Sequence, residues 1–198
     1  YKIEFKCFSF SYINIDGLFS KEIVLNNYNK YKFFKHMIMN DRTLTLKIER
    51  AISELRRGGK IVISDPNSRY SVLLVASELI QKDTVQELSE RALSRPNIIL
   101  SNNRCNAIGI KITDQSCSIL IDKDWSLHDI LSLCMPLTGH KIPIINGVIA
   151  ENNESIVFYC LLILRQSRLL PAGLMSIISN VAPENINQWA FNNNLIHI

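Results

Sequence analysis

Apolar positions recur at helical spacing in several stretches beyond residue 40. Over residues 43–57 they return every three or four positions, which predicts an amphipathic helix that the glycine pair 58–59 ends. A second helix is predicted to begin at Asp83, with Gln86 three positions on as a variant of the capping box. A third is predicted to begin at Ser126, whose side chain can cap it.

Later in the chain, residues 156–168 are apolar on nearly every face, which predicts a buried helix that Pro171 ends. Pro183 predicts the start of a last helix, with Trp189 on its apolar side. Short runs rich in apolar and β-branched residues predict strands at 60–64, 70–76, 97–100, 116–122, 140–145 and 173–178. Strands alternating with helices indicate an α/β domain with mixed α+β layers.

The composition changes abruptly near residue 37. Ten of the fourteen Phe and Tyr residues lie within the first 34 positions, without a sustained period of 2 or 3.6. We interpret residues 1–36 as a leader of doubtful status, either upstream sequence translated by mistake or the end of a truncated record. The alternative is an aromatic hairpin packed on the domain. The domain itself is expected to span residues 40–180.

The overall composition, 47% hydrophobic and 20% charged, is typical of a globular core. The net charge of +4 comes from 22 basic and 18 acidic residues without a basic run, so a nucleic-acid partner is not expected. The longest apolar run, residues 156–164, is about half of a membrane span, so a membrane partner is not expected either.

Side chains that could carry chemistry are scattered. The cysteines have no zinc-ligand spacing and are expected to be reduced core thiols of a cytoplasmic protein; they are Cys7, Cys105, Cys117, Cys134 and Cys160. The histidines have no carboxylate or cysteine at metal-ligand spacing; they are His36, His128, His140 and His197. Glycine-rich phosphate loops and a nucleophile elbow are absent from the sequence. The residues therefore assign no catalytic, cofactor-binding or metal-ligating position.

Four stretches nevertheless resemble, in the right order, the enzyme family of 3,4-dihydroxy-2-butanone 4-phosphate synthase. They are Ile48–Asp65, Leu74–Glu78, Gly139–Ile144 and Leu170–Leu174. Together they cover roughly residues 47–180. The resemblance implies that fold for a single domain.

The departures from the family concern its metal site. The family's first loop is dense with carboxylates that hold Mg²⁺, whereas residues 65–71 keep only Asp65. The family's metal-binding histidine, within Gly-His-Thr-Glu, falls on Ile156, and a later glutamate falls on Ile177. Its glycine- and threonine-rich substrate loop has no counterpart after Ile121. We therefore expect no catalytic, cofactor-binding or metal residue in this chain.

The family contains such degenerate domains in front of the catalytic domain of some bacterial GTP cyclohydrolase II proteins, and residues 164–172 resemble their closing helix. The resemblance implies a non-catalytic domain in riboflavin biosynthesis. Residues 181–198 would be a linker helix toward a missing cyclohydrolase domain, which alone would hold zinc. That domain, in cis or in trans, is the expected partner.

The same resemblance implies a homodimer. The formerly acidic or catalytic positions are now occupied by side chains suited to a closed core or an interface; they are Tyr70, Ile156, Val157, Phe158 and Ile177. The alternatives are a decayed stand-alone homologue, a binding module of related fold, and a working synthase that rebuilds its metal site from residues such as Asp65, Asp122 and Asp124. Whether the chain is itself an enzyme stays open at this point.

Overall fold

The computed structural model describes residues 42–64, 70–136, 141–151 and 155–198. Contacts within the chain group Ile38–Ile198 into one compact unit. The leader of residues 1–36 lies outside the described residues, so its status stays a prediction. No helix in the described part of the chain is both long and apolar enough to cross a membrane.

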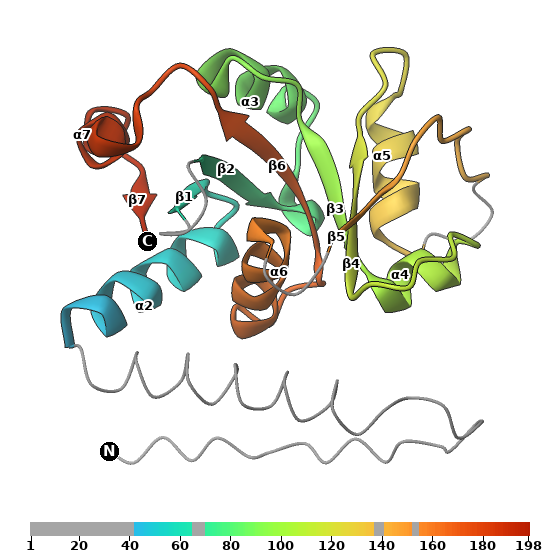
Figure 1. Ribbon diagram of the computed structural model, residues 1–198, viewed down its shortest axis with the longest axis horizontal. Coiled ribbons are helices and arrows are strands. Elements are labelled where there is room, and N and C mark those ends of the chain that lie inside the picture. Colours follow the sequence, from blue (N-terminus) through green and yellow to red (C-terminus); the bar gives the residue numbers. More distant parts are fainter. Residues whose placement is uncertain (1–41, 65–69, 137–140, 152–154) are drawn as a thin grey trace. The chain divides into compact units, whose positions relative to one another are not determined.

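The described residues build one seven-stranded sheet in the order β5-β4-β3-β6-β2-β1-β7 (Figure 1). The strands are β1 Ile61–Ser64, β2 Ser71–Ala76, β3 Asn97–Ser101, β4 Ser116–Leu120, β5 Ile149–Glu151, β6 Ala172–Ile178 and β7 Ile196–His197. Neighbours pair antiparallel except β1 and β7, which run parallel. Central β6 joins the β1–β2 hairpin to the β3–β4 pair, so the sheet is complete only when distant segments meet.

Helices cover both faces of this sheet, which confirms the expected mixed α+β architecture. They are α2 Arg42–Arg56, α3 Thr84–Ala92, α4 Asn102–Ala107, α5 Leu127–Cys134, α6 Ile156–Gln166 and α7 Ile186–Asn192. In Figure 1, α2 and α6 lie side by side below the sheet, and α3 lies above it. The larger hydrophobic core lies between the sheet and α3, α4, α5 and α7. The opposite face packs on α2 and α6.

The end of α2 follows the sequence prediction. Gly58 has a φ of +82°, and the backbone amides of Gly58 and Gly59 donate to the carbonyls of Leu55 and Glu54 at 3.1 and 2.9 Å. This arrangement satisfies carbonyls that the last helical turn leaves open, and it needs a left-handed residue that glycine supplies without strain. The chain then turns directly into β1.

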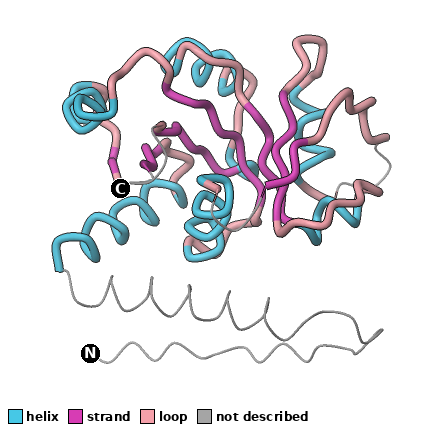
Figure 2. The backbone as a smooth tube through the Cα atoms, viewed as in Figure 1, coloured by secondary structure: helices cyan, strands magenta, loops and turns pink. Residues whose placement is uncertain are grey.

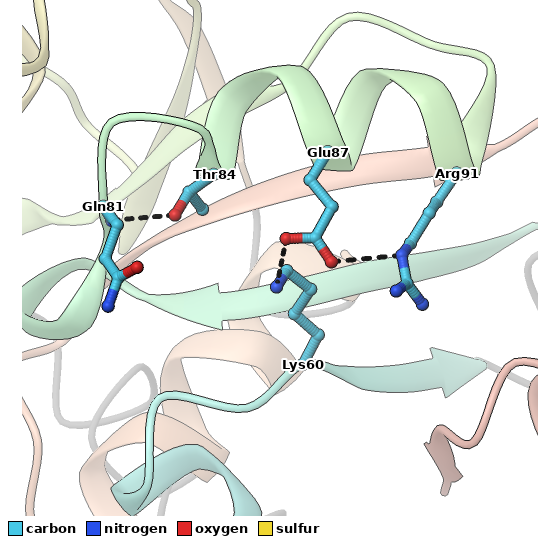
Figure 3. Close-up of polar contacts among 5 residues, drawn as sticks. All are labelled: Lys60, Gln81, Thr84, Glu87 and Arg91. Atoms are coloured by element: carbon cyan, nitrogen blue, oxygen red, sulfur yellow. Dashed lines mark hydrogen bonds and ion pairs between the residues drawn. The ribbon is translucent and has the colours of Figure 1, made fainter.

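The start of α3 differs from its prediction in its chemistry. Asp83 is the N-cap residue, but its side chain makes no capping hydrogen bond. Instead, the Thr84 hydroxyl accepts the backbone amide of Gln81 at 2.8 Å (Figure 3). The capping-box prediction was therefore wrong, because a threonine one position later holds the preceding turn.

An ion-pair chain fastens α3 to the start of β1. Glu87 receives Lys60 Nζ at 2.7 Å and Arg91 Nε at 3.1 Å (Figure 3). Lys60 lies just before β1, and its side chain is the least exposed of the three. Because Lys60 is partly buried, the Lys60–Glu87 ion pair is less sensitive to screening by salt than a fully exposed pair.

The strand predicted at residues 140–145 was wrong. His140 lies outside the described residues, and residues 141–148 run as loop, drawn in pink in Figure 2. The strand forms later, at β5, where Ile149 pairs with Ser118 of β4. The short helix α4 was not predicted, because it carries polar residues and follows β3 without a break.

The C-terminal segment contributes to the sheet. Residues 181–198 were expected to form a linker helix, and they contain a 3₁₀ turn at Pro183–Asn185, helix α7 and strand β7. The backbone amide of Ile198 donates to Val62 at 3.0 Å, and that of Ser64 donates to Ile198 at 2.9 Å. Residues 181–198 therefore belong to the same compact unit as the rest of the domain. Whether a catalytic domain follows them stays a prediction.

Candidate functional site

The positions at which the resemblance would put metal chemistry begin at the N-terminus of α6. Ser155 caps the helix, and its hydroxyl accepts the backbone amide of Phe158 at 3.4 Å. Ile156 is 8% exposed and Val157 is 1% exposed, so both side chains are buried. The first turn of α6 therefore presents hydrocarbon where the family has Gly-His-Thr-Glu. Hydrocarbon supplies no ligand to a hard cation.

The other altered positions behave differently. Phe158 is half-buried, with its ring 5.8 Å from that of Tyr159 in an edge-to-face arrangement. Tyr70 is 54% exposed, and Ile177, where the family has a glutamate, is 39% exposed. The five replacements thus divide between core and surface, and only the pair at the start of α6 fills the interior.

The three aspartates considered for a rebuilt metal site cannot all be placed. Asp65 lies outside the described residues. Asp122 accepts the Asp124 backbone amide at 3.2 Å and the Asn146 side-chain amide at 3.3 Å. Asp122, Asp124 and Asn146 line an open hollow of about 430 Å³. Its other walls are Trp125, Asp129, Pro143 and Ile144.

Asp129 in this hollow is already committed to the start of α5. Its carboxylate accepts the Ser126 hydroxyl at 2.6 Å and the Ser126 backbone amide at 2.8 Å, completing a capping box. These hydrogen bonds from Ser126 lower the pKa of Asp129. Within the described ranges, no group of three or more His, Cys, Asp or Glu side chains is arranged to hold a metal ion.

The space beside α6 is small. A cavity of about 30 Å³ lies between this helix and the sheet, lined by Ser101, Gln115, Phe158, Leu161, Leu162 and Arg165. It has room for water but not for a sugar phosphate.

The cysteines that the structure describes are buried, free thiols: Cys105, Cys117, Cys134 and Cys160. Cys7 lies outside the described residues. Burial raises the pKa of Cys134 to about 12 and also raises that of Cys160. Such thiols are protonated and unreactive at neutral pH. The sulfur atoms of Cys105 and Cys117 are 2.8 Å apart inside the core.

Three exposed apolar side chains lie on the face of the sheet opposite the larger hydrophobic core. Leu120 and Ile149 are 50% and 61% exposed, and with Ile177 they point to the face that α6 covers farther along the strands. The register supports this placement, because Leu120 and Met175 both oppose Asn97 and Ile177 follows Met175 by two residues. We call Leu120, Ile149 and Ile177 the sheet patch. Exposed apolar side chains on one face of a sheet can mark an interaction surface.

A hydrogen-bonded group at the opposite edge of the sheet was missed from the sequence. Ser64 of β1, Asn187 of α7 and His197 of β7 form a connected chain. His197 was interpreted as an isolated tail residue. No sequence signal could have found this group, because 133 positions separate Ser64 from His197.

No protein-family model matches the sequence, and no curated protein does. Solved structures do match. The 3,4-dihydroxy-2-butanone 4-phosphate synthase of Candida albicans is 16% identical with a TM-score of 0.62, over 76% of this chain and 92% of that one. A cation-free synthase structure is 12% identical with a TM-score of 0.61, over 76% and 91%.

A third match is RibBX, a two-domain synthase from A. baumannii, which is 13% identical with a TM-score of 0.60. The alignment covers 76% of this chain and 54% of RibBX. The seven-stranded sheet and the helices on both its faces agree with these neighbours. The described part of this chain has the fold of 3,4-dihydroxy-2-butanone 4-phosphate synthase.

Proposed function

We propose that this chain is a domain with the synthase fold but without the synthase activity, and that it serves riboflavin biosynthesis in the cytoplasm as the structural partner of a GTP cyclohydrolase II catalytic domain. The partner would lie in cis or in trans and would itself hold the zinc. The observation that carries the proposal is the buried Ile156–Val157 pair at the start of α6 within an intact synthase fold.

The metal requirement of a synthase explains why the Ile156–Val157 pair argues against synthase activity. A structure of the enzyme is known with two magnesium ions, and such ions require several oxygen ligands. The Ile156 side chain has no oxygen, nitrogen or sulfur atom, so it cannot bind a cation in any rotamer. A framework that persists without its site is consistent with a role in shape and assembly.

The purified chain should not convert ribulose 5-phosphate to dihydroxybutanone phosphate in the presence of Mg²⁺. The reason is the apolar start of α6 together with the exposed Ile177 in place of a glutamate. Product formation would be measured against a no-protein blank, with an active synthase in the same buffer as the positive control. Product above the blank would refute the proposed loss of synthase activity.

The assembly role predicts a homodimer in which the sheet patch is covered. Sedimentation at micromolar concentration should show a dimer in about 0.5 M NaCl, because salt screens exposed ion pairs far more than it weakens apolar burial. Ile177→Asp should shift the equilibrium to monomer, since it places a charge in the contact. Phe191→Asp is the matched control, because Phe191 of α7 is 76% exposed and lies outside the patch.

Only monomer for the unaltered chain would contradict the dimer. Equal behaviour of Ile177→Asp and Phe191→Asp would contradict the assigned surface. The same experiment with added GTP cyclohydrolase II catalytic domain tests the partnership, since a bound partner appears as a heavier species.

A further inference from the structure

Ser64, His197 and Asn187, from distant parts of the sequence, form a chain of hydrogen bonds at the edge of the sheet where β7 pairs with β1. The Ser64 hydroxyl lies 2.8 Å from His197 Nε2, and His197 Nδ1 lies 2.5 Å from Asn187 Oδ1. The parallel pairing of β7 with β1 sets His197 opposite Val62, two residues before Ser64. Ser64 and His197 are half-buried, whereas Asn187 is exposed. A backbone pairing therefore fixes the serine and the imidazole relative to each other.

The partners of the imidazole determine where its proton resides. Asn187 Oδ1 can only accept, so His197 Nδ1 carries the hydrogen and donates it. Nε2 is then left with a lone pair and accepts the Ser64 hydroxyl proton. The Ser71 hydroxyl lies 2.5 Å from that of Ser64. Since the Ser64 proton is used in the bond to His197, Ser71 is the donor of this pair. The serine proton thus already points at the base.

The surroundings also keep the base neutral. Partial burial, followed by the positive charge of Lys47 on α2, lowers the pKa of His197 below its ordinary value of 6.5. The elements with the most contacts to β7 are α2, β1 and α7, and neither β1 nor α7 carries a titratable side chain. Helix α2 carries several charged side chains, of which Lys47 is the one whose charge acts on His197; they are Arg42, Lys47, Glu49, Arg50, Glu54 and Arg56. The imidazole is therefore unprotonated at neutral pH and can take a proton from Ser64.

We propose that Ser64 is an activated nucleophile, with His197 as its general base and Asn187 as the residue that orients the imidazole, and that it reacts with carboxylic esters. The arrangement has the order of groups that nucleophilic catalysis needs: a hydroxyl, a base within hydrogen-bond reach, and a third group that orients the base. It does not depend on the apolar start of α6 or on the proposed assembly role.

The reaction balances with water as the co-reactant. The Ser64 oxygen bonds to the ester carbonyl carbon while its proton passes to His197 Nε2. The bond from that carbon to the leaving oxygen then breaks, and the imidazolium returns the proton to the alcohol. Water attacks the acyl-serine through the same base, which releases the acid and restores the serine hydroxyl.

The test uses a fluorophosphonate probe, which forms a bond between the serine oxygen and phosphorus as fluoride leaves and the proton passes to His197. Mass spectrometry of the intact chain should locate the label on Ser64. Ser126 is an internal control: it is exposed, but its hydroxyl donates to the carboxylate of Asp129, a much weaker base than an imidazole. Ser126 should stay unlabelled.

Ser64→Ala should abolish labelling, and His197→Ala should slow it by about 100-fold, the lower end of what general-base catalysis contributes. The unaltered chain supplies a readout that needs no variant. Its labelling rate should be constant above neutral pH and fall as pH decreases through the lowered pKa of His197.

Absence of label on Ser64 above the level on Ser126 would overturn the proposal. So would a labelling rate at Ser64 that does not change with pH. In both cases the three side chains would serve only to tie β7 to β1.

Discussion

Replacing Gly173 with alanine should destabilise the domain by about 2 to 3 kcal/mol, the usual cost of forcing an extra group into a packed core. A Cβ at this position of β6 would lie 2.7 Å from the Val75 carbonyl oxygen and 3.0 Å from Leu164 Cδ1. The first contact is with backbone of the neighbouring strand, which cannot move without disturbing the β2–β6 pairing. For a domain of this size the melting temperature should fall by roughly 5 to 10 °C.

Gly147→Ala is the matched control. A Cβ at Gly147 would have no heavy atom within 4 Å, and its φ lies outside the left-handed region. Thermal unfolding followed by circular dichroism should therefore give a melting temperature close to that of the unaltered chain. Equal losses for the two variants would contradict the close approach of β2 and α6 to Gly173.

A chain that ends at residue 180 should lose about 5 kcal/mol of stability, a large part of the roughly 5 to 15 kcal/mol that stabilises a typical folded domain. Ile186 and Ala190 of α7 are 4% and 1% exposed, and burying one isoleucine is worth about 1.5 to 3 kcal/mol. The truncation also removes both backbone hydrogen bonds that join Ile198 to β1. Urea unfolding would measure the loss.

A point variant separates packing from chain length in this test. Ile186→Ala should lower the free energy of unfolding by about 2 kcal/mol or more, because it removes a buried side chain. Phe191→Ala on the same helix should have little effect, since the ring is exposed. An unchanged stability after truncation would restore the simple linker interpretation of residues 181–198.

The sequence also predicted that this chain lacks the metal site of the synthase family. It predicted that Ile156 replaces a metal-binding histidine and that Ile177 replaces a glutamate, but it could not distinguish the environments of the two side chains. Ile156 is 8% exposed in the first turn of α6, whereas Ile177 is 39% exposed near the end of β6. Exposure depends on which element covers a position, and that is not encoded within a few neighbouring residues.

The sequence by itself determined the elements whose interactions are local. The helices α2, α5 and α6 and the strands β1, β2, β3 and β6 lie close to where periodicity, caps and β-branched runs predicted them. Helical hydrogen bonds join residues four apart, and Gly58 and Ser126 stop or start helices through neighbours in the chain. These elements were sufficient to predict the fold class.

Only the tertiary structure determined the edge strands of the sheet and the hydrogen bonds that join Ser64, His197 and Asn187. The three residues of β5 and the two of β7 are too short for a pattern to reveal, and each exists because a partner strand supplies its hydrogen bonds. Residues 141–145 look like a strand yet run as loop, with no place in the sheet order. His197 meets Ser64 for the same reason, because the pairing of β7 with β1 joins positions that no local interaction connects, and Asn187 reaches His197 from helix α7.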